Sequence, residues 1–145
     1  MYGWDSDNFE AGNELGIFEF QGIKLGIRIC YEIRFPEYFR ELYRERTDIN
    51  VVLFYDVSDC EDVQRFDMIK GHLQTRAVEN VTTTVSVNTI FPYQTAPTAV
   101  FDKSGRICME CGRQEELLVY DYVKMDDDFG ETGRRNISNQ LTVTL

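Results

Sequence analysis

Short apolar runs alternate with polar, glycine-containing turns along the first part of the chain. Two of these runs, Gly16 to Phe20 and Ile23 to Ile29, flank Gln21-Gly22, and this spacing predicts a β-hairpin. Ile49 to Tyr55 is a continuous apolar run, which is typical of a buried strand. Val81 to Val87 is rich in threonine and valine and predicts another strand.

Two other segments repeat apolar residues at intervals of three and four, the spacing of one helical face. The first begins near Pro36, a residue that fits the first turn of a helix because its missing N–H costs nothing there. The second spans roughly 61–80, with Ser58 or Asp59 as its expected N-cap. The two apolar stripes comprise Phe35, Tyr38, Phe39, Leu42 and Tyr43, and then Val63, Phe66, Ile69, Leu73 and Ala77.

The flanking segments complete the predicted architecture. Residues 1–14 are polar without periodicity and predict a loop. Thr98 to Phe101 and Arg106 to Cys111 are expected to pair across a tight turn, and Leu117 to Val123 predicts a further strand, followed by an acidic tail from Lys124. Strands and helices alternating in this order predict an α/β fold of packed layers in a single domain, residues 1–145.

Composition narrows the class of protein. A chain of 145 residues with 43% hydrophobic content fits one globular domain. The net charge of −10 and the pI near 4.5 argue against nucleic acid as a partner. No apolar run approaches the ~20 residues of a membrane span, and no signal-peptide pattern is recognised. Four cysteines at positions 30, 60, 108 and 111 suit a reducing compartment, so we expect a cytoplasmic protein.

The apolar run that starts at Ile23 stops abruptly at Cys30, just before the helix at Pro36. A strand–turn–helix layout aims the side chain at the turn toward a cleft, and nearby backbone N–H groups can lower a thiol pKa and hold an oxyanion. We therefore expect Cys30 alone among the cysteines to have an unusually low pKa. This pattern fits a nucleophile, but it also fits a buried cysteine at a strand end. No histidine adjoins Cys30 to activate it, so both interpretations stay open.

The other cysteine chemistry that the spacing suggests is less favoured. Cys108 and Cys111 form a C-x-x-C pair, but zinc needs two further ligands and the only histidine is His72. On a regular strand, cysteines three apart point to opposite faces, so we predict no metal site there. His72 lies inside a predicted helix without an evident orienting Asn or Asp, which disfavours a Cys–His protease centre.

Three blocks of sequence resemble a known family. GIKLGIRICYEIRFPEYFRELY, residues 22–43, is similar to the nucleophile segment of the nitrilase, or carbon–nitrogen hydrolase, superfamily. HLQTRAVENVTTTVSVN, from His72 to Asn88, resembles the family's Arg-Ala-x-Glu-Asn helix end and the strand after it. TAVFDKSGRI, from Thr98 to Ile107, is similar to its Asp-x-x-Gly hairpin. The blocks occur in the family's order.

This resemblance implies a fold and a mechanism. The family fold is a four-layer α/β/β/α sandwich with internal pseudo-symmetry, of which this chain would be about the C-terminal half. Members hydrolyse amide-like C–N bonds without a cofactor, using a glutamate base, a lysine and a cysteine. The resemblance makes Cys30 the nucleophile and the backbone N–H of Tyr31 an oxyanion donor. The base and the catalytic lysine precede the nucleophile in the family, and Lys24, on the strand itself, does not match that lysine.

The resemblance also suggests weaker site candidates. Asp5 falls near the position of a second family glutamate, although its side chain is one methylene shorter and an exposed loop carboxylate fits equally. Glu32 and Arg34 are expected to hold the turn and line the substrate cleft, where an exposed ion pair would look the same. Asp56, at the end of a predicted strand, is a further candidate for substrate binding.

Other matching positions are expected to be structural. Arg76, Glu79 and Asn80 should clamp the end of their helix through charge-assisted hydrogen bonds. Family members usually have a proline near Phe54 or Tyr55, and Tyr55-Asp56-Val57 departs from that pattern.

Two interpretations of the whole chain stay open. In the first, it is the C-terminal part of an amidase that acts on a small carboxamide, with the missing residues supplied by another chain or lost. In the second, it is a non-catalytic sandwich half that serves as an assembly or binding module. In both, one sheet face would lack its facing sheet and expose roughly several hundred Å² of apolar surface. We therefore expect a homo-oligomer or a pair with a complementary N-terminal chain.

Overall fold

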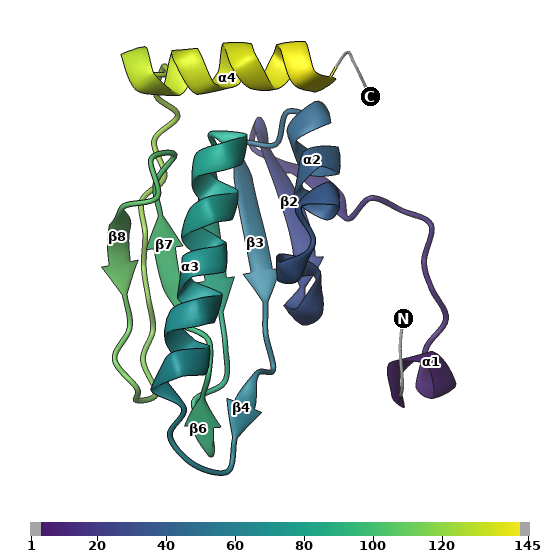
Figure 1. Ribbon diagram of the computed structural model, residues 1–145, viewed down its shortest axis with the longest axis vertical. Coiled ribbons are helices and arrows are strands. Elements are labelled where there is room, and N and C mark those ends of the chain that lie inside the picture. The colour runs from purple at the N-terminus through teal and green to yellow at the C-terminus, as the bar shows by residue number, and fades with distance from the viewer. Residues whose placement is uncertain (1–3, 143–145) are drawn as a thin grey trace.

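The computed structural model describes residues 4–142, in which a six-stranded sheet carries helices against one face (Figure 1). The sheet has the order β1-β2-β3-β5-β7-β8; β2, β3 and β5 run parallel, and the other neighbours are antiparallel. The strands are β1 (Ile17–Phe20), β2 (Ile23–Ile29), β3 (Ile49–Leu53), β5 (Thr83–Val87), β7 (Ala99–Phe101) and β8 (Ile107–Glu110), with a separate ribbon of β4 (Val57–Ser58) and β6 (Tyr93–Gln94). The helices are α1 (Trp4–Asn8), the 3₁₀ helix η1 (Cys30–Arg34), α2 (Pro36–Arg44), α3 (Val63–Asn80) and α4 (Phe129–Thr142). The predicted mixed α/β class is confirmed.

The predicted hairpin is present as β1 and β2. Gln21 and Gly22 both have positive φ, 51° and 75°, the backbone conformation that a type I′ two-residue hairpin turn requires at both central positions. The expected pairing of the segments around Lys103-Ser104-Gly105 is also confirmed, as β7 and β8.

Helices α2 and α3 cover one face of the sheet and supply its core. Phe39 and Leu42 of α2 are fully buried, as are most of the α3 stripe residues predicted from periodicity. Gly26 of β2 explains the close approach of α2, because a Cβ atom at this position would lie 2.8 Å from the Leu42 methyl groups. The outer members of both stripes are exposed instead: Phe35, Tyr38 and Val63. None of the helices described between residues 4 and 142 is long and apolar enough to cross a membrane.

Several local predictions were wrong. The N-cap of α3 is Asp62, whose Oδ1 accepts the Arg65 N–H at 2.9 Å, because Ser58 is instead paired in the β4–β6 ribbon. Within residues 4–14 the loop prediction missed the short helix α1. Leu117 to Val123 does not join the sheet; this segment leads instead to Lys124, whose Nζ pairs with Asp48 at 2.7 Å.

The tail also contains a helix that periodicity did not predict. Asp128 and Glu131 form a reciprocal cap at the start of α4: Oδ1 of Asp128 accepts the Glu131 N–H, and Oε2 of Glu131 accepts the Asp128 N–H. Figure 1 shows α4 in yellow across the end of the molecule where β3 begins. Tyr43 of α2 holds it there through hydrogen bonds from its hydroxyl to Arg135 O and Asn139 Oδ1.

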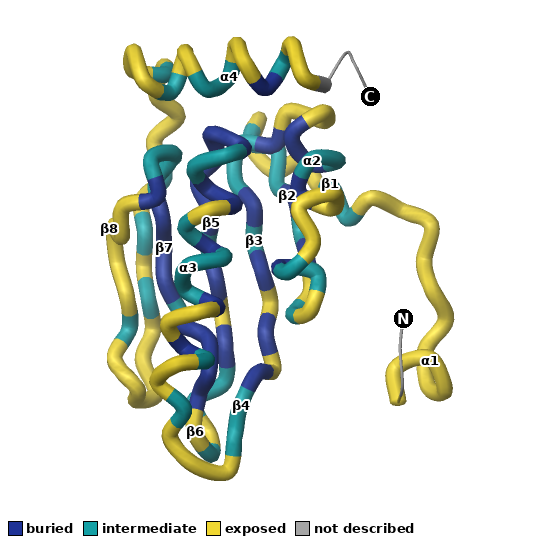
Figure 2. Tube along the Cα trace, in the orientation of Figure 1, coloured by how far each residue is buried: buried dark blue, intermediate teal, exposed yellow. Residues whose placement is uncertain are grey.

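The opposite face of the sheet is not covered by a helix. Strand register places side chains of β1, β2, β3 and β5 together on this side, and we refer to them as the open face: Phe18, Phe20, Ile23, Leu25, Ile27, Ile29, Ile49, Val51, Leu53, Val85 and Val87. None of these apolar residues is buried, whereas Thr83 of β5 and Val100 of β7, which the register places on the same side, are buried. Figure 2 shows the buried positions along β3, β5 and β7.

Candidate active site

The residue at the end of β2 forms a sharp elbow. Cys30 has φ of 43°, a left-handed conformation that is unfavourable for a residue with a Cβ atom and that turns the chain out of the strand into η1. The Glu32 side chain accepts the N–H of Ile29 at 2.6 Å and fixes the turn. Ile33 is buried, and its carbonyl accepts a hydrogen bond from Arg76 of α3 at 3.1 Å. The elbow is therefore held from within and from the helix layer.

Arg76 performs the structural role predicted for it. Its guanidinium is buried and also pairs with Glu79 at 2.9 Å, while Asn80 donates to the Arg76 carbonyl at 2.9 Å. The helix end that resembles the family motif thus anchors the elbow and does not itself supply a reacting group.

Cys30 lies between backbone donors and a charged pair. The sulfur is half-buried, and the backbone N–H groups of Tyr55 and Tyr31 act to lower the pKa of its thiol. Burial and the nearby Asp56 carboxylate raise the pKa of the thiol above its ordinary 9.0, although both N–H groups and Arg65 act in the opposite direction. The expected low pKa of Cys30 is therefore wrong for this chain, because desolvation and a like-charge neighbour prevail.

Asp56 is the centre of a hydrogen-bonded network at the end of β3. Its buried carboxylate accepts at Oδ1 from Arg65 Nε at 3.0 Å, Arg65 Nη2 at 2.7 Å and Thr95 Oγ1 at 2.8 Å. Asn88 fixes the backbone of the same residue, with its Oδ1 accepting the Asp56 N–H and its Nδ2 donating to the Asp56 carbonyl. A carboxylate is thereby immobilised near the candidate nucleophile.

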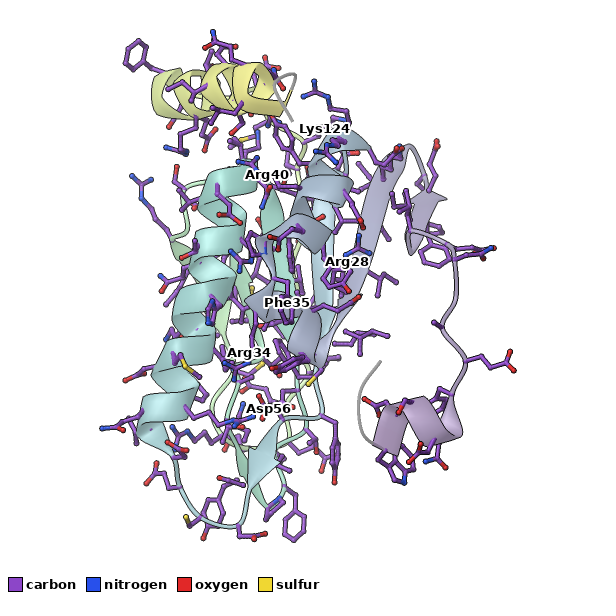
Figure 3. All side chains as sticks on the ribbon, turned by 45° about the vertical axis from the view of Figure 1, so that its right-hand side comes forward. Arg28, Arg34, Phe35, Arg40, Asp56 and Lys124 are labelled. Atoms are coloured by element: carbon purple, nitrogen blue, oxygen red, sulfur yellow. The ribbon has the colours of Figure 1, made fainter. Side chains whose placement is uncertain are left out.

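Other candidates are distributed differently. Figure 3 shows Arg34 and Asp56 toward the end of the sheet away from α4, where β2 and β3 finish. Arg34 lies over the Tyr31 ring, 5.5 Å from its centroid. Asp5 is on α1, which is fully exposed and stands apart from the sheet in Figure 1, so the structure does not bring Asp5 to Cys30.

Sequence reasoning missed Arg65, Thr95 and Asn88 as neighbours of this site. Arg65 belongs to the first turn of α3, Asn88 directly follows β5, and Thr95 directly follows β6. No local pattern in the sequence indicates these three residues, because they come together only where the carboxyl ends of β3 and β5 lie side by side. Asn88 also lines a hollow of about 430 Å³ together with Phe91, Thr98 and Cys111.

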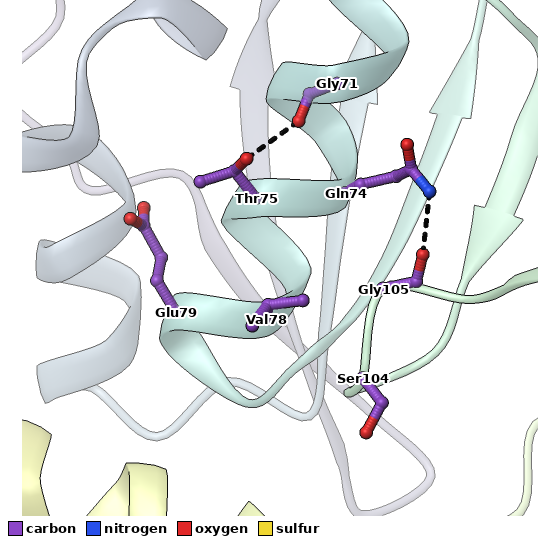
Figure 4. A pocket seen from close by; sticks show the side chains of 7 residues that line it. All are labelled: Gly71, Gln74, Thr75, Val78, Glu79, Ser104 and Gly105. Carbon is purple, nitrogen blue, oxygen red and sulfur yellow. Dashed lines mark hydrogen bonds between the residues drawn. The ribbon is translucent and has the colours of Figure 1, made fainter.

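The histidine and the second hollow lie away from the site around Cys30, and the other cysteines form no metal-binding cluster within the described part of the chain. His72 is in the middle of α3, and burial together with Arg76 and Arg34 lowers its pKa. Within residues 4–142, no three His, Cys, Asp or Glu side chains are grouped to hold a metal ion. A second hollow, of about 480 Å³, lies on the outer side of α3 beside Gly105 (Figure 4), where Gln74 Nε2 donates to the glycine carbonyl at 3.0 Å.

Comparisons with known proteins show the family of the chain. The sequence profile of the carbon–nitrogen hydrolases matches residues 3–127. The chain is 35% identical over 112 residues to the 2-oxoglutaramate amidase of Bacillus subtilis, which covers 74% of this chain and 41% of that protein. It is 28% identical over 141 residues to an (R)-stereoselective amidase of a Pseudomonas species, which covers 92% of this chain and 48% of the relative.

Solved structures share the fold. The NitN amidase of Nesterenkonia sp. AN1 has a TM-score of 0.67 at 23% identity, over 98% of this chain and 55% of its own. Nit3 of Saccharomyces cerevisiae, a member of the nitrilase superfamily, has a TM-score of 0.62 at 23% identity, over 77% of this chain and 41% of its own.

The mixed sheet with its helices has the fold of these nitrilase-superfamily structures. The chain belongs to the carbon–nitrogen hydrolase family. It spans about half the length of the relatives that it matches, 41% and 48% of the two amidases.

Proposed function

We propose that this chain forms the nucleophile-bearing half of an amidase that hydrolyses a small carboxamide. The observation that carries the proposal is the Cys30 elbow, where the sulfur projects from a strand end with backbone donors beside it. Amidase relatives support the reaction class. A solved structure of the NitN amidase, moreover, has acrylamide added at its active-site cysteine.

In the proposed reaction, the deprotonated Cys30 sulfur attacks the amide carbon and forms a C–S bond. The carbonyl oxygen becomes an oxyanion that accepts a hydrogen bond from the Tyr31 N–H. The C–N bond then breaks, the nitrogen leaves as ammonia after gaining a proton, and water cleaves the thioester to the carboxylic acid. A base glutamate and an oxyanion lysine, expected from the resemblance, would lie outside residues 1–145.

Asp56 is the carboxylate that we propose to face the substrate, in preference to Asp5. Its Oδ1 is fixed by Arg65 and Thr95, so the group cannot swing away from the end of β3. Arg34 would line the same end, while Glu32 acts as a positioning residue because its carboxylate is already bonded to the Ile29 N–H.

The open face would receive a second sheet and so complete the four-layer sandwich. Its occupant would be a complementary N-terminal chain or, as the alternative arrangement, a second copy of this chain. All four cysteines are free, which agrees with a reducing compartment, and we propose the cytoplasm.

Ammonia release from small carboxamides tests the proposal. We expect no appreciable turnover from the isolated chain, since each missing electrostatic donor typically costs ~10²–10³ in rate. Activity should appear when the upstream half is co-expressed, and Cys30→Ala should abolish it. Robust turnover by the isolated chain that is lost in Cys30→Ala would show that the chain supplies its own base and lysine.

A further inference from the structure

The direction of one backbone N–H follows from the pairing of β3. The N–H of Phe54 donates to the Val87 carbonyl of β5 at 2.8 Å. Because the N–H groups of a strand point alternately to its two neighbours, the next N–H, that of Tyr55, points toward β2. The last rung between those strands is Ile29 with Leu53, so at the level of Tyr55 the β2 chain has reached Cys30.

At this level β2 no longer offers a strand carbonyl. Cys30 turns out of the strand with φ of 43°, so the Tyr55 N–H is directed at the turn that carries the Cys30 side chain. The Tyr55 N–H lowers the pKa of the Cys30 thiol, which agrees with this geometry. The Tyr31 N–H approaches the same sulfur from η1, so the two donors come from different elements.

The segment after β3 is rigid enough to keep that N–H in place. The carbonyl of the next residue, Asp56, accepts the Thr95 N–H at 2.9 Å and Asn88 Nδ2 at 2.8 Å, and its own N–H donates to Asn88 Oδ1 at 3.0 Å. The Tyr55 side chain, in contrast, is 76% exposed, so any contribution of this residue to the site comes from its backbone.

We propose that the backbone N–H of Tyr55 is a second hydrogen-bond donor to the Cys30 sulfur, which holds the nucleophile in position and stabilises its thiolate. The Tyr55 N–H and the positive Arg65 both favour the thiolate of Cys30, whereas the negative Asp56 carboxylate disfavours it. The catalytic value of the hydrogen bond rests on the proposed role of Cys30 as nucleophile. The existence of the hydrogen bond does not depend on that role, so experiments can refute the hydrogen bond and the nucleophile role separately.

The test removes the N–H while leaving little else changed. Tyr55→Pro lacks the donor, and Tyr55→Ala is the matched control that keeps the donor but loses the exposed ring. Cys30 alkylation by iodoacetamide is followed from pH 7 to 10 by peptide mapping of the full chain. We expect Tyr55→Ala to match the unmodified protein. Tyr55→Pro should alkylate Cys30 roughly tenfold more slowly over the lower part of this pH range, as for a midpoint raised by about one pH unit. Coincident profiles for all three proteins would overturn the proposal.

A second measurement does not depend on how proline affects the fold. In the Tyr55→Phe variant, which removes the titrating phenol, the amide resonance at position 55 should shift with pH together with alkylation of Cys30. The shift should disappear when Cys30→Ala is added. An amide at position 55 that stays constant while Cys30 titrates would overturn the proposal, whereas loss of amidase turnover in Cys30→Ala tests only the nucleophile role.

Discussion

The two faces of the sheet differ in burial more than the polarity of their side chains would suggest. On the helix-covered face, Asn50, Thr84 and Ser86 are fully buried, and Ser86 Oγ donates to the Pro97 carbonyl at 2.7 Å. On the open face, the apolar Ile29 and Leu53 are 63% and 42% exposed. Burial in this chain is therefore decided by which elements face a strand, since alternate residues of the same strands go to opposite sides.

The register of the parallel strands makes the open face continuous. Ile27, Val51 and Val85 form one row across β2, β3 and β5, and Ile29 with Leu53 begins the next. Parallel strands are normally covered on both faces, which supports the proposal that the open face receives a second layer.

The largest expected effect is on association. Leaving the open face wet, at ~25 cal/mol per Å² over several hundred Å², costs on the order of 10 kcal/mol, comparable with the stability of a domain. We expect sedimentation at micromolar concentration to show self-association, aggregation or pairing with an added N-terminal half. A monodisperse monomer that melts cooperatively and binds no apolar dye would mean that these residues close their own core.

A pair of neighbouring substitutions compares the two faces directly. Val52→Asp buries a charge on the helix-covered face, where the side chain is 0% exposed, and should cost several kcal/mol and unfold most of the protein. Leu53→Asp places the same charge on the open face and should change the stability of the isolated chain by less than ~1 kcal/mol while weakening association. Denaturant unfolding and sedimentation measure the two effects. Equal losses of stability would contradict an uncovered face.

The reactivity of the cysteines compares Cys30, at the edge between the two faces, with Cys60 and Cys108 in exposed segments. Because burial and Asp56 raise the pKa of Cys30, little of its thiol is ionised at pH 7 to 8. Iodoacetamide should therefore label the exposed Cys60 and Cys108 before Cys30, and the Cys30 rate should keep rising with pH above 9. Peptide mapping of a time course measures this order. Preferential labelling of Cys30 at pH 7 would show that its surroundings favour the thiolate after all.

The smallest expected effect concerns α4, which covers neither face. Arg135 first, and also Lys103, lower the pKa of Asp127 to about 2 from an ordinary 3.8. A lowered acid pKa stabilises the fold above pH 4 and loses that contribution as the pH falls toward 2. Asp127→Asn should cost about 1 kcal/mol at pH 7 and progressively less below pH 4 in denaturant unfolding. A deficit that does not depend on pH would point to a steric cause.

The sequence by itself determined the elements whose side-chain pattern is local. Alternation and apolar runs located β1, β2, β3 and β5, and three- and four-residue spacing located α2 and α3. The position of Cys30 at the end of a strand followed from the same pattern, because an apolar run stops there. The helix α4 was also marked locally, by the reciprocal cap of Asp128 and Glu131, but Gly130 and Gly133 weakened the helical signal.

Only the tertiary structure decided the chemistry around Cys30. Asp56 and Arg65 act on the pKa of the Cys30 thiol because parallel β3 ends beside β2 and Arg65, in the first turn of α3, bonds to Asp56 at that end. No local spacing in the sequence contains this proximity. The effect of Asp56 and Arg65 on the thiol depends on distance and desolvation, so the pKa of Cys30 moves opposite to what the elbow alone predicted. Likewise, hydropathy marked Leu53 and Val52 alike as apolar, and only the position of the helices determined that one is exposed and the other buried.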